Sequence, residues 1–265
     1  MSLPIEQDDI YATLQYPVYF NIQPYVKHMT LSPFMLLHII TGSIAVIAGV
    51  LALIQKKGQK PHRLSGKVFV ISMTIMALSG AYIAYLKPMM ITLIAGFYTL
   101  HLVLTAYMVV KSPEKTCTQF DYYTPLSSGG LVCLSMYFGL QALNHENGTF
   151  QGFSHEPYFF FALLSAIVLI GDIRLLICKG LTHGHRLTRH VWRMCFALYL
   201  AIGSFFGQGA KALPETISQS VLIELPEPLI LLIMTFWLLK TAIKSRKFAS
   251  TTTTSKSTKC KTTSS

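Results

Sequence analysis

The residues best suited to chemistry are histidines that lie inside or beside long apolar stretches of the chain. His38 falls within "LLHIITGSIAVIAGVLALI" and His101 within the apolar run 89–110, while His62 and His190 stand near the starts of two further runs. Ionisable side chains inside a membrane span are costly and usually functional. Imidazole nitrogens are also common axial ligands of haem iron. The four histidines therefore suggest haem or a proton path.

Small residues beside two of these histidines favour the haem hypothesis. Gly42 follows His38 by four residues, and Gly66 follows His62 by the same spacing. A glycine one helical turn from a ligand leaves room for a porphyrin ring. Arg63, next to His62, is a candidate partner for a haem propionate.

Depth within the bilayer decides which histidines could pair across a haem b. His62 and His190 both lie at the inner mouths of their spans, so they are the expected axial ligands of an inner haem iron, with Arg193 as a second propionate partner. His38 or His101 would hold an outer site. At ~1.5 Å per residue these two differ in depth by ~10 Å, so they pair only if their helices are offset.

Three other interpretations of the same residues remain open. His38 and His101 could simply donate hydrogen bonds between helices, each contributing about 1 kcal/mol or less. A proton-coupled small-molecule transporter would use His38, His101 and Asp172 as a titrating path. A non-catalytic assembly or scaffold subunit would need none of this chemistry. The simplest role for Asp172 is to neutralise a basic residue such as Arg193 on a neighbouring helix, with a proton relay as the alternative.

Metal-binding and hydrolytic motifs have little support in the sequence. His183, His185 and His190 give three imidazoles for zinc, but on an expected loop without a fixed carboxylate partner. The sequence contains no phosphate-binding glycine loop, no H-E-x-x-H and no G-x-S-x-G. Whether the protein is an enzyme, and which substrate or electron donor it would use, stays open.

Composition indicates which elements must position these residues. The chain has 265 residues, 52% of them hydrophobic and only 12% charged, with mean hydropathy +0.47. Soluble domains carry about 25% charged residues, and a membrane span needs ~20 apolar ones. Long apolar runs predict an all-α polytopic membrane bundle rather than a barrel. The seven expected transmembrane helices cover 33–55, 65–86, 89–110, 126–143, 158–178, 190–208 and 221–243.

The basic residues predict an orientation with the N-terminus outside and the C-terminus inside. Of the 22 lysines and arginines, only Lys27, Lys87 and Lys211 fall on the expected outer side. This is a strong positive-inside bias. The net charge of +11 also favours anionic inner-leaflet lipids as partners. Nucleic-acid binding is not expected, because the basic residues are spread over several short loops. A redox partner or an oligomer remains unspecified.

The chain divides into three expected regions. Residues 1–30 form an outer interfacial segment, 31–247 the seven-helix domain, and 248–265 a polar, disordered cytoplasmic tail. Within the first span His38, Gly42, Ala45 and Gly49 share one helical face. This stripe of small residues predicts a close helix contact, with the His38 ring pointing into the bundle.

Three stretches resemble a known family. "LLHIITGSIAVIAGVLALI", "KPHRLSGKVFVISMTIMALSGAYIA" and "RHVWRMCFALYLAI" are similar to predicted bacterial multi-pass membrane proteins catalogued as a domain of unknown function. The resemblance covers about residues 33–207 and implies a location in the bacterial inner membrane. Some members are loosely similar to b561 and ferric-reductase haem bundles. The matching motif residues are His38, Gly42, His62, Arg63, Gly66 and His190.

Overall fold

The computed structural model describes residues 32–209 and 225–240, and these are almost entirely helical. The expected N-terminal segment and C-terminal tail lie outside the described residues. From Phe34 onward the chain forms one unit. Its helices are α1 (Pro33–Ile54), α2 (Lys60–Leu86), α3 (Met90–Lys111), α4 (Gln119–Asn144), α5 (His155–Ile177) and α6 (His183–Gly209), followed by a helix over 226–240.

Five of these helices, α1 to α5, are long and apolar enough to cross a membrane. The helix α6 begins seven residues before the expected start at 190, so it includes Arg186 and Arg189 as well as Arg193. The helix over 226–240 begins at two closely spaced prolines, Pro226 and Pro228. Proline is tolerated in a first turn, because the amide hydrogens there have no helical partner. The rest of the expected seventh span lies outside the described residues.

The helix α4 also begins earlier than expected, at Gln119 instead of 126. The backbone N–H of Thr118 donates to Asp121 Oδ2 at 2.7 Å, which caps the first turn. Pro125 lies inside the helix. The capping pair therefore adds two turns to the expected span and brings the hydroxyl-rich stretch 124–128 into the helix.

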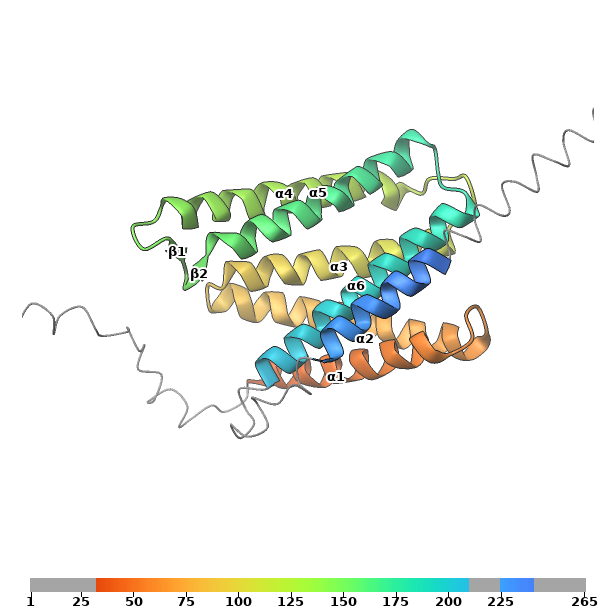
Figure 1. Ribbon diagram of the computed structural model, residues 1–265, viewed down its shortest axis with the longest axis horizontal. Coiled ribbons are helices and arrows are strands. Elements are labelled where there is room, and N and C mark those ends of the chain that lie inside the picture. The colour runs from red at the N-terminus through yellow and green to blue at the C-terminus, as the bar shows by residue number, and fades with distance from the viewer. Residues whose placement is uncertain (1–31, 210–224, 241–265) are drawn as a thin grey trace, which may run out of the picture. The chain divides into compact units, whose positions relative to one another are not determined.

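The helix α3 lies at the centre of the arrangement and contacts α2, α4, α5 and α6 (Figure 1). The small-residue seam predicted for α1 is confirmed, since Gly42, Ala45 and Gly49 are all buried. A Cβ on Gly49 would lie 2.7 Å from Leu198 Cδ1 of α6. By contrast, large side chains such as Ile71 and Ile170 are 60% and 67% exposed. Exposed apolar side chains on long apolar helices are typical of a surface that faces lipid.

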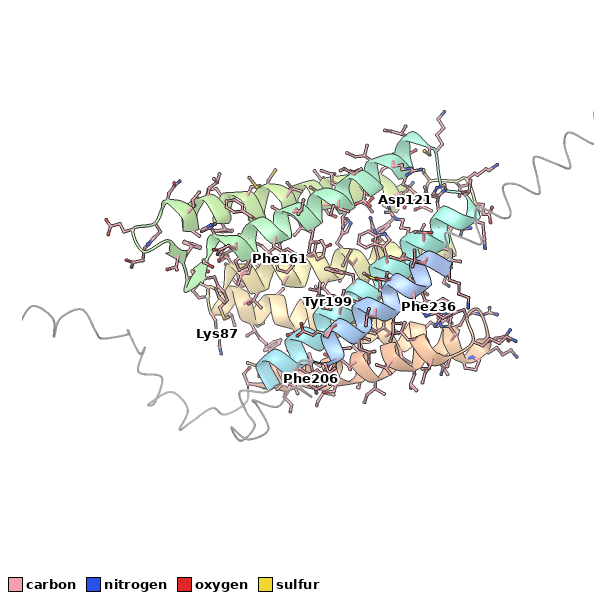
Figure 2. All side chains as sticks on the ribbon, in the orientation of Figure 1. Lys87, Asp121, Phe161, Tyr199, Phe206 and Phe236 are labelled. Atoms are coloured by element: carbon pink, nitrogen blue, oxygen red, sulfur yellow. The ribbon has the colours of Figure 1, made fainter. Side chains whose placement is uncertain are left out.

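The loops gather at two ends of the bundle. At one end, called here the basic end, the loops are 55–59, 112–118 and 178–182, and the Lys115 N–H donates to the Leu181 carbonyl at 3.2 Å. At the other end the Met90 N–H donates to Gln151 Oε1 at 2.8 Å. Figure 2 labels Asp121 and Lys87 near these two ends respectively.

A short hairpin that the sequence did not predict closes the second end. The strands β1 (Thr149–Phe150) and β2 (Phe153–Ser154) pair antiparallel, with Phe150 opposite Phe153. The turn between them uses Gly152 at φ +79°, a backbone conformation that glycine adopts without strain. The Phe150 ring stacks on Phe138 of α4, so the hairpin is packed onto the helices.

Candidate functional site

The carboxylate of Asp172 is fully buried and accepts four side-chain hydrogen bonds. Its Oδ1 accepts from Arg189 Nη2 at 2.5 Å and from Arg193 Nη2 at 2.8 Å. Its Oδ2 accepts from His101 Nε2 at 3.0 Å and from Ser128 Oγ at 2.8 Å. The predicted neutralisation of Asp172 by Arg193 from a neighbouring helix is therefore confirmed.

These groups come from four helices: α3 supplies His101, α4 supplies Ser128, α5 supplies Asp172, and α6 supplies the two arginines. The arginines are four residues apart, which places both guanidinium groups on one face of α6. Arg193 also donates to Thr105 Oγ1. We call the set the Asp172 network; it comprises His101, Thr105, Ser127, Ser128, Asp172, Arg189 and Arg193.

A glycine makes room for the two guanidinium groups. A Cβ on Gly171 would lie 3.6 Å from Arg193 Nη2 and 3.7 Å from Arg189 Nη1. The Gly171 carbonyl accepts from Arg189 Nη1 at 2.9 Å. The α5 backbone therefore takes part in holding α6 at the level of Asp172.

The charges of the Asp172 network do not cancel. One carboxylate faces two guanidinium groups, and Arg189 and Arg193 are 6% and 0% exposed. A buried ion pair is tolerated when further hydrogen bonds satisfy its remaining donors and acceptors. Here Asp172 is saturated, whereas the Nε atoms of both arginines have no hydrogen-bond partner among the described residues. The network thus holds one excess positive charge while its histidine is neutral.

The second nitrogen of His101 reaches the surface of the bundle through Ser127. Its Nδ1 lies 2.6 Å from Ser127 Oγ, and Ser127 is exposed. Since the carboxylate of Asp172 can only accept, the proton of a neutral His101 is on Nε2 and Nδ1 accepts from the Ser127 hydroxyl. Ser127 Oγ also lies 3.2 Å from the Thr124 carbonyl. If Nδ1 were protonated, the serine could accept from it and donate to that carbonyl instead.

A cavity of about 380 Å³ lies between α3 and α4 at this point. We call it the α3–α4 groove. Its polar groups are His101, Ser127 and Thr124, and the Thr124 hydroxyl is engaged with the Asp121 carbonyl. The remaining lining residues are apolar or aromatic and comprise Phe97, Leu100, Leu104, Phe120, Tyr123, Gly130 and Leu131.

The His38 ring is held against α2. Its Nδ1 lies 2.9 Å from the Met76 carbonyl of α2, and its ring packs on Gly80, where a Cβ would come within 2.7 Å of it. The space at Gly42 is used by the Met76 side chain, whose sulfur would lie 3.3 Å from an added Cβ. The glycine that accommodates the His38 ring is therefore Gly80 of the neighbouring helix. Both sites act in helix packing.

His62 and His190 each direct one ring nitrogen to a backbone carbonyl of another helix. His62 Nδ1 lies 3.0 Å from the Ala52 carbonyl of α1, and His190 Nδ1 lies 2.9 Å from the Ala106 carbonyl of α3.

The other residues considered for haem and zinc lie on α2 and α6. Arg63 is exposed and donates to the Gly58 carbonyl at 3.1 Å, while a Cβ on Gly66 would meet no atom within 4 Å. His183 pairs with Glu114, and His185 pairs with Thr182, within or just before α6 instead of on a free loop. Across 32–209 and 225–240, no cluster of three or more histidine, cysteine or acidic side chains is arranged for a metal ion.

Sequence reasoning missed four members of the network: Thr105, Ser127, Ser128 and Arg189. The spacing of Arg189 and Arg193 on one helical face was a usable signal, but the expected span started at 190 and excluded Arg189. The hydroxyl residues gave no comparable signal. A serine or threonine within a helix more often bonds to its own backbone one turn earlier.

The chain Ser127–His101–Asp172 has the residue types of a serine nucleophile with its base and acid. Two observations argue against acyl transfer. Asp172 is shared with two guanidinium groups, whereas the acid of a catalytic triad serves the histidine alone. Ser127 also lies within α4, where backbone N–H groups are used by the helix and cannot form an oxyanion hole. The arrangement is better suited to exchanging a proton or binding a polar group.

Comparison with known proteins agrees with a membrane location and gives no activity. Residues 35–115 match a family described as "Predicted membrane protein (DUF2306)". This match confirms the resemblance seen in the first two histidine-containing stretches, and it ends before α4. No curated protein and no solved structure matches the chain. Together with five apolar helices of sufficient length, the family match supports an integral membrane protein.

Proposed function

We propose that the chain is a proton-coupled membrane protein in which His101 is the titrating group of the Asp172 network. The observation that carries this proposal is the placement of the His101 ring between a buried carboxylate and an exposed serine. Asp172 is fixed in its ionised form by two arginines, so the imidazole is the member of the network that can change its charge. Among the described residues, the Ser127 side of the ring is the one that faces the surface of the bundle.

Protonation of His101 would change the electrostatic interactions of several helices at once. The network joins α3, α4, α5 and α6 through one carboxylate, and it already carries an excess positive charge. A positive charge on His101 would be the second excess charge of the network. It would strengthen the contact of His101 with Asp172 and repel Arg189 and Arg193. Protonation would therefore favour one packing of the helices over another. Coupling between a proton and a transported or bound molecule requires such a change in packing.

The ¹⁵N resonances of the His101 ring, measured in lipid bilayers between pH 5 and 9, test this proposal. Selective ¹⁵N-histidine labelling and a His101→Gln variant assign the signals. We expect His101 to change between a neutral and a doubly protonated ring in the acidic part of this range, because burial and the two arginines oppose a charge on the ring. His38 has the matched environment of an intramembrane imidazole on a backbone carbonyl, and a His38→Gln variant leaves the His101 titration unchanged. A His101 ring that stays neutral at every pH would refute the proposal and favour a structural subunit.

A second candidate, haem b between His62 and His190, has one specific observation in its favour. Histidine ligands usually donate the second ring N–H to a carbonyl or carboxylate, which fixes the ring and leaves the other nitrogen for the metal. Both Nδ1 atoms are placed in this way, so both Nε2 atoms are available. His62 and His190 would hold the iron, and the haem would supply one-electron transfer. To ligate an outer haem through Nε2, His101 would have to lose its hydrogen bond to Asp172.

The haem candidate is tested by the absorption spectrum of protein purified from haem-supplemented cells. A Soret band that is lost in both His62→Phe and His190→Phe, and retained in His183→Phe, would support it. His183 is the matched control because it lies on α6 and its Nδ1 pairs with Glu114 at the surface. A colourless wild-type preparation would exclude haem at this site.

For the whole chain we propose seven spans, with the basic end and the C-terminus on the cytoplasmic side of a bacterial inner membrane. The support is the charge pattern: the described loops at the basic end carry Lys56, Lys57, Lys115 and Lys179, whereas the turn at the other end carries Lys87. Lysines at this end are also suited to contact with anionic lipid headgroups.

A further inference from the structure

We infer that the α3–α4 groove binds the ring of a lipid-soluble quinone or hydroquinone, which contacts His101 and Ser127. This inference deepens the proposed function, because it names the ligand class of the site at which His101 exchanges its proton. It rests on the residues that line the groove, on the two polar groups among them, and on the side from which the groove opens.

The walls of the groove fit a flat apolar ring. Phe97 of α3 and Phe120 and Tyr123 of α4 contribute aromatic faces, and leucines supply most of the remaining lining. The volume of about 380 Å³ lies within the usual range for small-molecule sites, ~300–1,000 Å³. Apolar walls with a few polar groups that orient the ligand are typical of such sites. A charged headgroup would lose its hydration here without gaining a partner of opposite sign on the walls.

The lining offers one hydrogen-bond acceptor and one donor, and these suit both redox forms of a quinone. The carbonyl of a quinone can accept from the Ser127 hydroxyl. The hydroxyl of a hydroquinone can donate to Nδ1 of a neutral His101. Ser127 can turn toward the Thr124 carbonyl when Nδ1 takes another partner, since both acceptors lie within reach of its Oγ. The site therefore provides a partner for a carbonyl and for a hydroxyl without moving a helix.

The groove opens on the side of the bundle that faces lipid. Tyr123 is 69% exposed and Phe97 is 43% exposed, although both lie on helices apolar enough to span a membrane. His101 is ten residues before the end of α3 at Lys111, which corresponds to ~15 Å along the helix. A molecule dissolved in the bilayer could therefore reach His101 without passing through water.

Binding of decylubiquinone and decylubiquinol to the full chain in lipid nanodiscs tests the inference, with empty nanodiscs measuring the partition into lipid. The key variant is Gly130→Leu. A Cβ on Gly130 meets no atom within 4 Å, and the residue lines the groove, so the leucine takes up space in the groove while every member of the Asp172 network keeps its own side chain. The matched control is Gly66→Leu on α2, where a Cβ also meets no atom within 4 Å.

We expect saturable binding of one quinone per wild-type chain, weakened at least about tenfold by Gly130→Leu, which corresponds to ~1.4 kcal/mol, and unchanged in Gly66→Leu. Binding no greater than that of empty nanodiscs, or equal binding by both leucine variants, overturns the inference. So does finding that diacylglycerol or phospholipid occupies the groove and is not displaced by the quinone.

The proton proposal and the quinone proposal can be refuted independently of each other. Quinone binding with a His101 ring that never titrates keeps the binding site and removes the proton proposal. Titration of His101 without quinone binding keeps the proton proposal and removes the quinone site.

Discussion

At the scale of single residues, Asp172 is the group on which most of the polar structure depends. It is the acceptor for two arginines, a histidine and a serine, all within a region that excludes water. Taking away one partner of a buried charge pair leaves the other charge without compensation, and this is more damaging than removing both. The consequences of changing Asp172 are therefore larger than those of changing any one of its donors.

We predict that Asp172→Asn destabilises the protein by about 3–5 kcal/mol, the range typical of breaking a buried ion pair. Thermal unfolding in detergent, followed by circular dichroism, measures the change. Asp121→Asn is the matched control, because Asp121 is also buried but acts in a helix cap that asparagine can largely replace. The double variant Asp172→Asn with Arg193→Met should recover part of the loss. Equal melting of Asp172→Asn and wild type would contradict the assigned role.

The pairing of Asp172 could be predicted from the sequence because a buried charge must be neutralised, and few basic residues lie at the same level. The two serines of α4 could not be assigned to it in the same way. Their contacts with His101 and Asp172 span 26 and 44 residues of sequence, and they depend on how α3, α4 and α5 cross. A single sequence carries no direct signal for that geometry.

At the scale of elements, the hairpin of α1 and α2 is held by histidines that cross between its helices in both directions. His38 of α1 contacts the Met76 carbonyl of α2, while His62 of α2 contacts the Ala52 carbonyl of α1. The face containing His38 was predicted correctly from its spacing with Gly42 and Ala45. The glycine that contacts the His38 ring was not predicted, because this residue, Gly80, lies on a different helix.

Gly80 and Gly66 on α2 should respond oppositely to alanine. In an open helical position alanine is more favourable than glycine by about 1 kcal/mol, so Gly66→Ala should be neutral or stabilising by up to that amount. At Gly80 the added Cβ would lie 2.7 Å from His38 Cε1, and overpacking of this kind costs about 1–3 kcal/mol. Thermal unfolding of the two variants provides the comparison.

Combining Gly80→Ala with His38→Ala separates a clash from a loss of flexibility. Removal of the ring should relieve the effect of the Gly80 substitution, so that the double variant is no less stable than His38→Ala alone. If Gly80→Ala is as stable as Gly66→Ala, the ring of His38 does not pack on that glycine.

At the scale of the whole molecule, the two ends of the bundle differ in their number of basic residues. Native cysteines can report on which side of the membrane the basic end lies. Cys178 is exposed in the α5–α6 connection at the basic end, and Cys117 is half-buried in the α3–α4 loop at the same end. Burial, with the nearby Asp121 carboxylate, raises the pKa of the Cys117 thiol. Because the thiolate is the reactive form, Cys117 should react more slowly than Cys178.

We predict that a membrane-impermeant maleimide labels Cys178 in inverted membrane vesicles and not in intact spheroplasts. A Gly148→Cys variant in a background lacking the native cysteines should show the opposite pattern, since Gly148 lies in the α4–α5 connection at the other end. Mass spectrometry identifies the labelled sites. Labelling of both positions from one side would refute the proposed orientation and the alternation of spans.

The arginines of α6 have a consequence for how the chain enters the bilayer. A helix carrying Arg186, Arg189 and Arg193 would be a poor candidate for insertion by itself, since each arginine near a bilayer centre opposes insertion by about 3 kcal/mol. Asp172 precedes all three in the chain, so its carboxylate is synthesised first and can receive two of them. Biogenesis should therefore follow a fixed order, in which α5 waits at the insertion machinery until α6 emerges, and the two enter the hydrocarbon together with the Asp172 carboxylate offsetting part of the arginine charge.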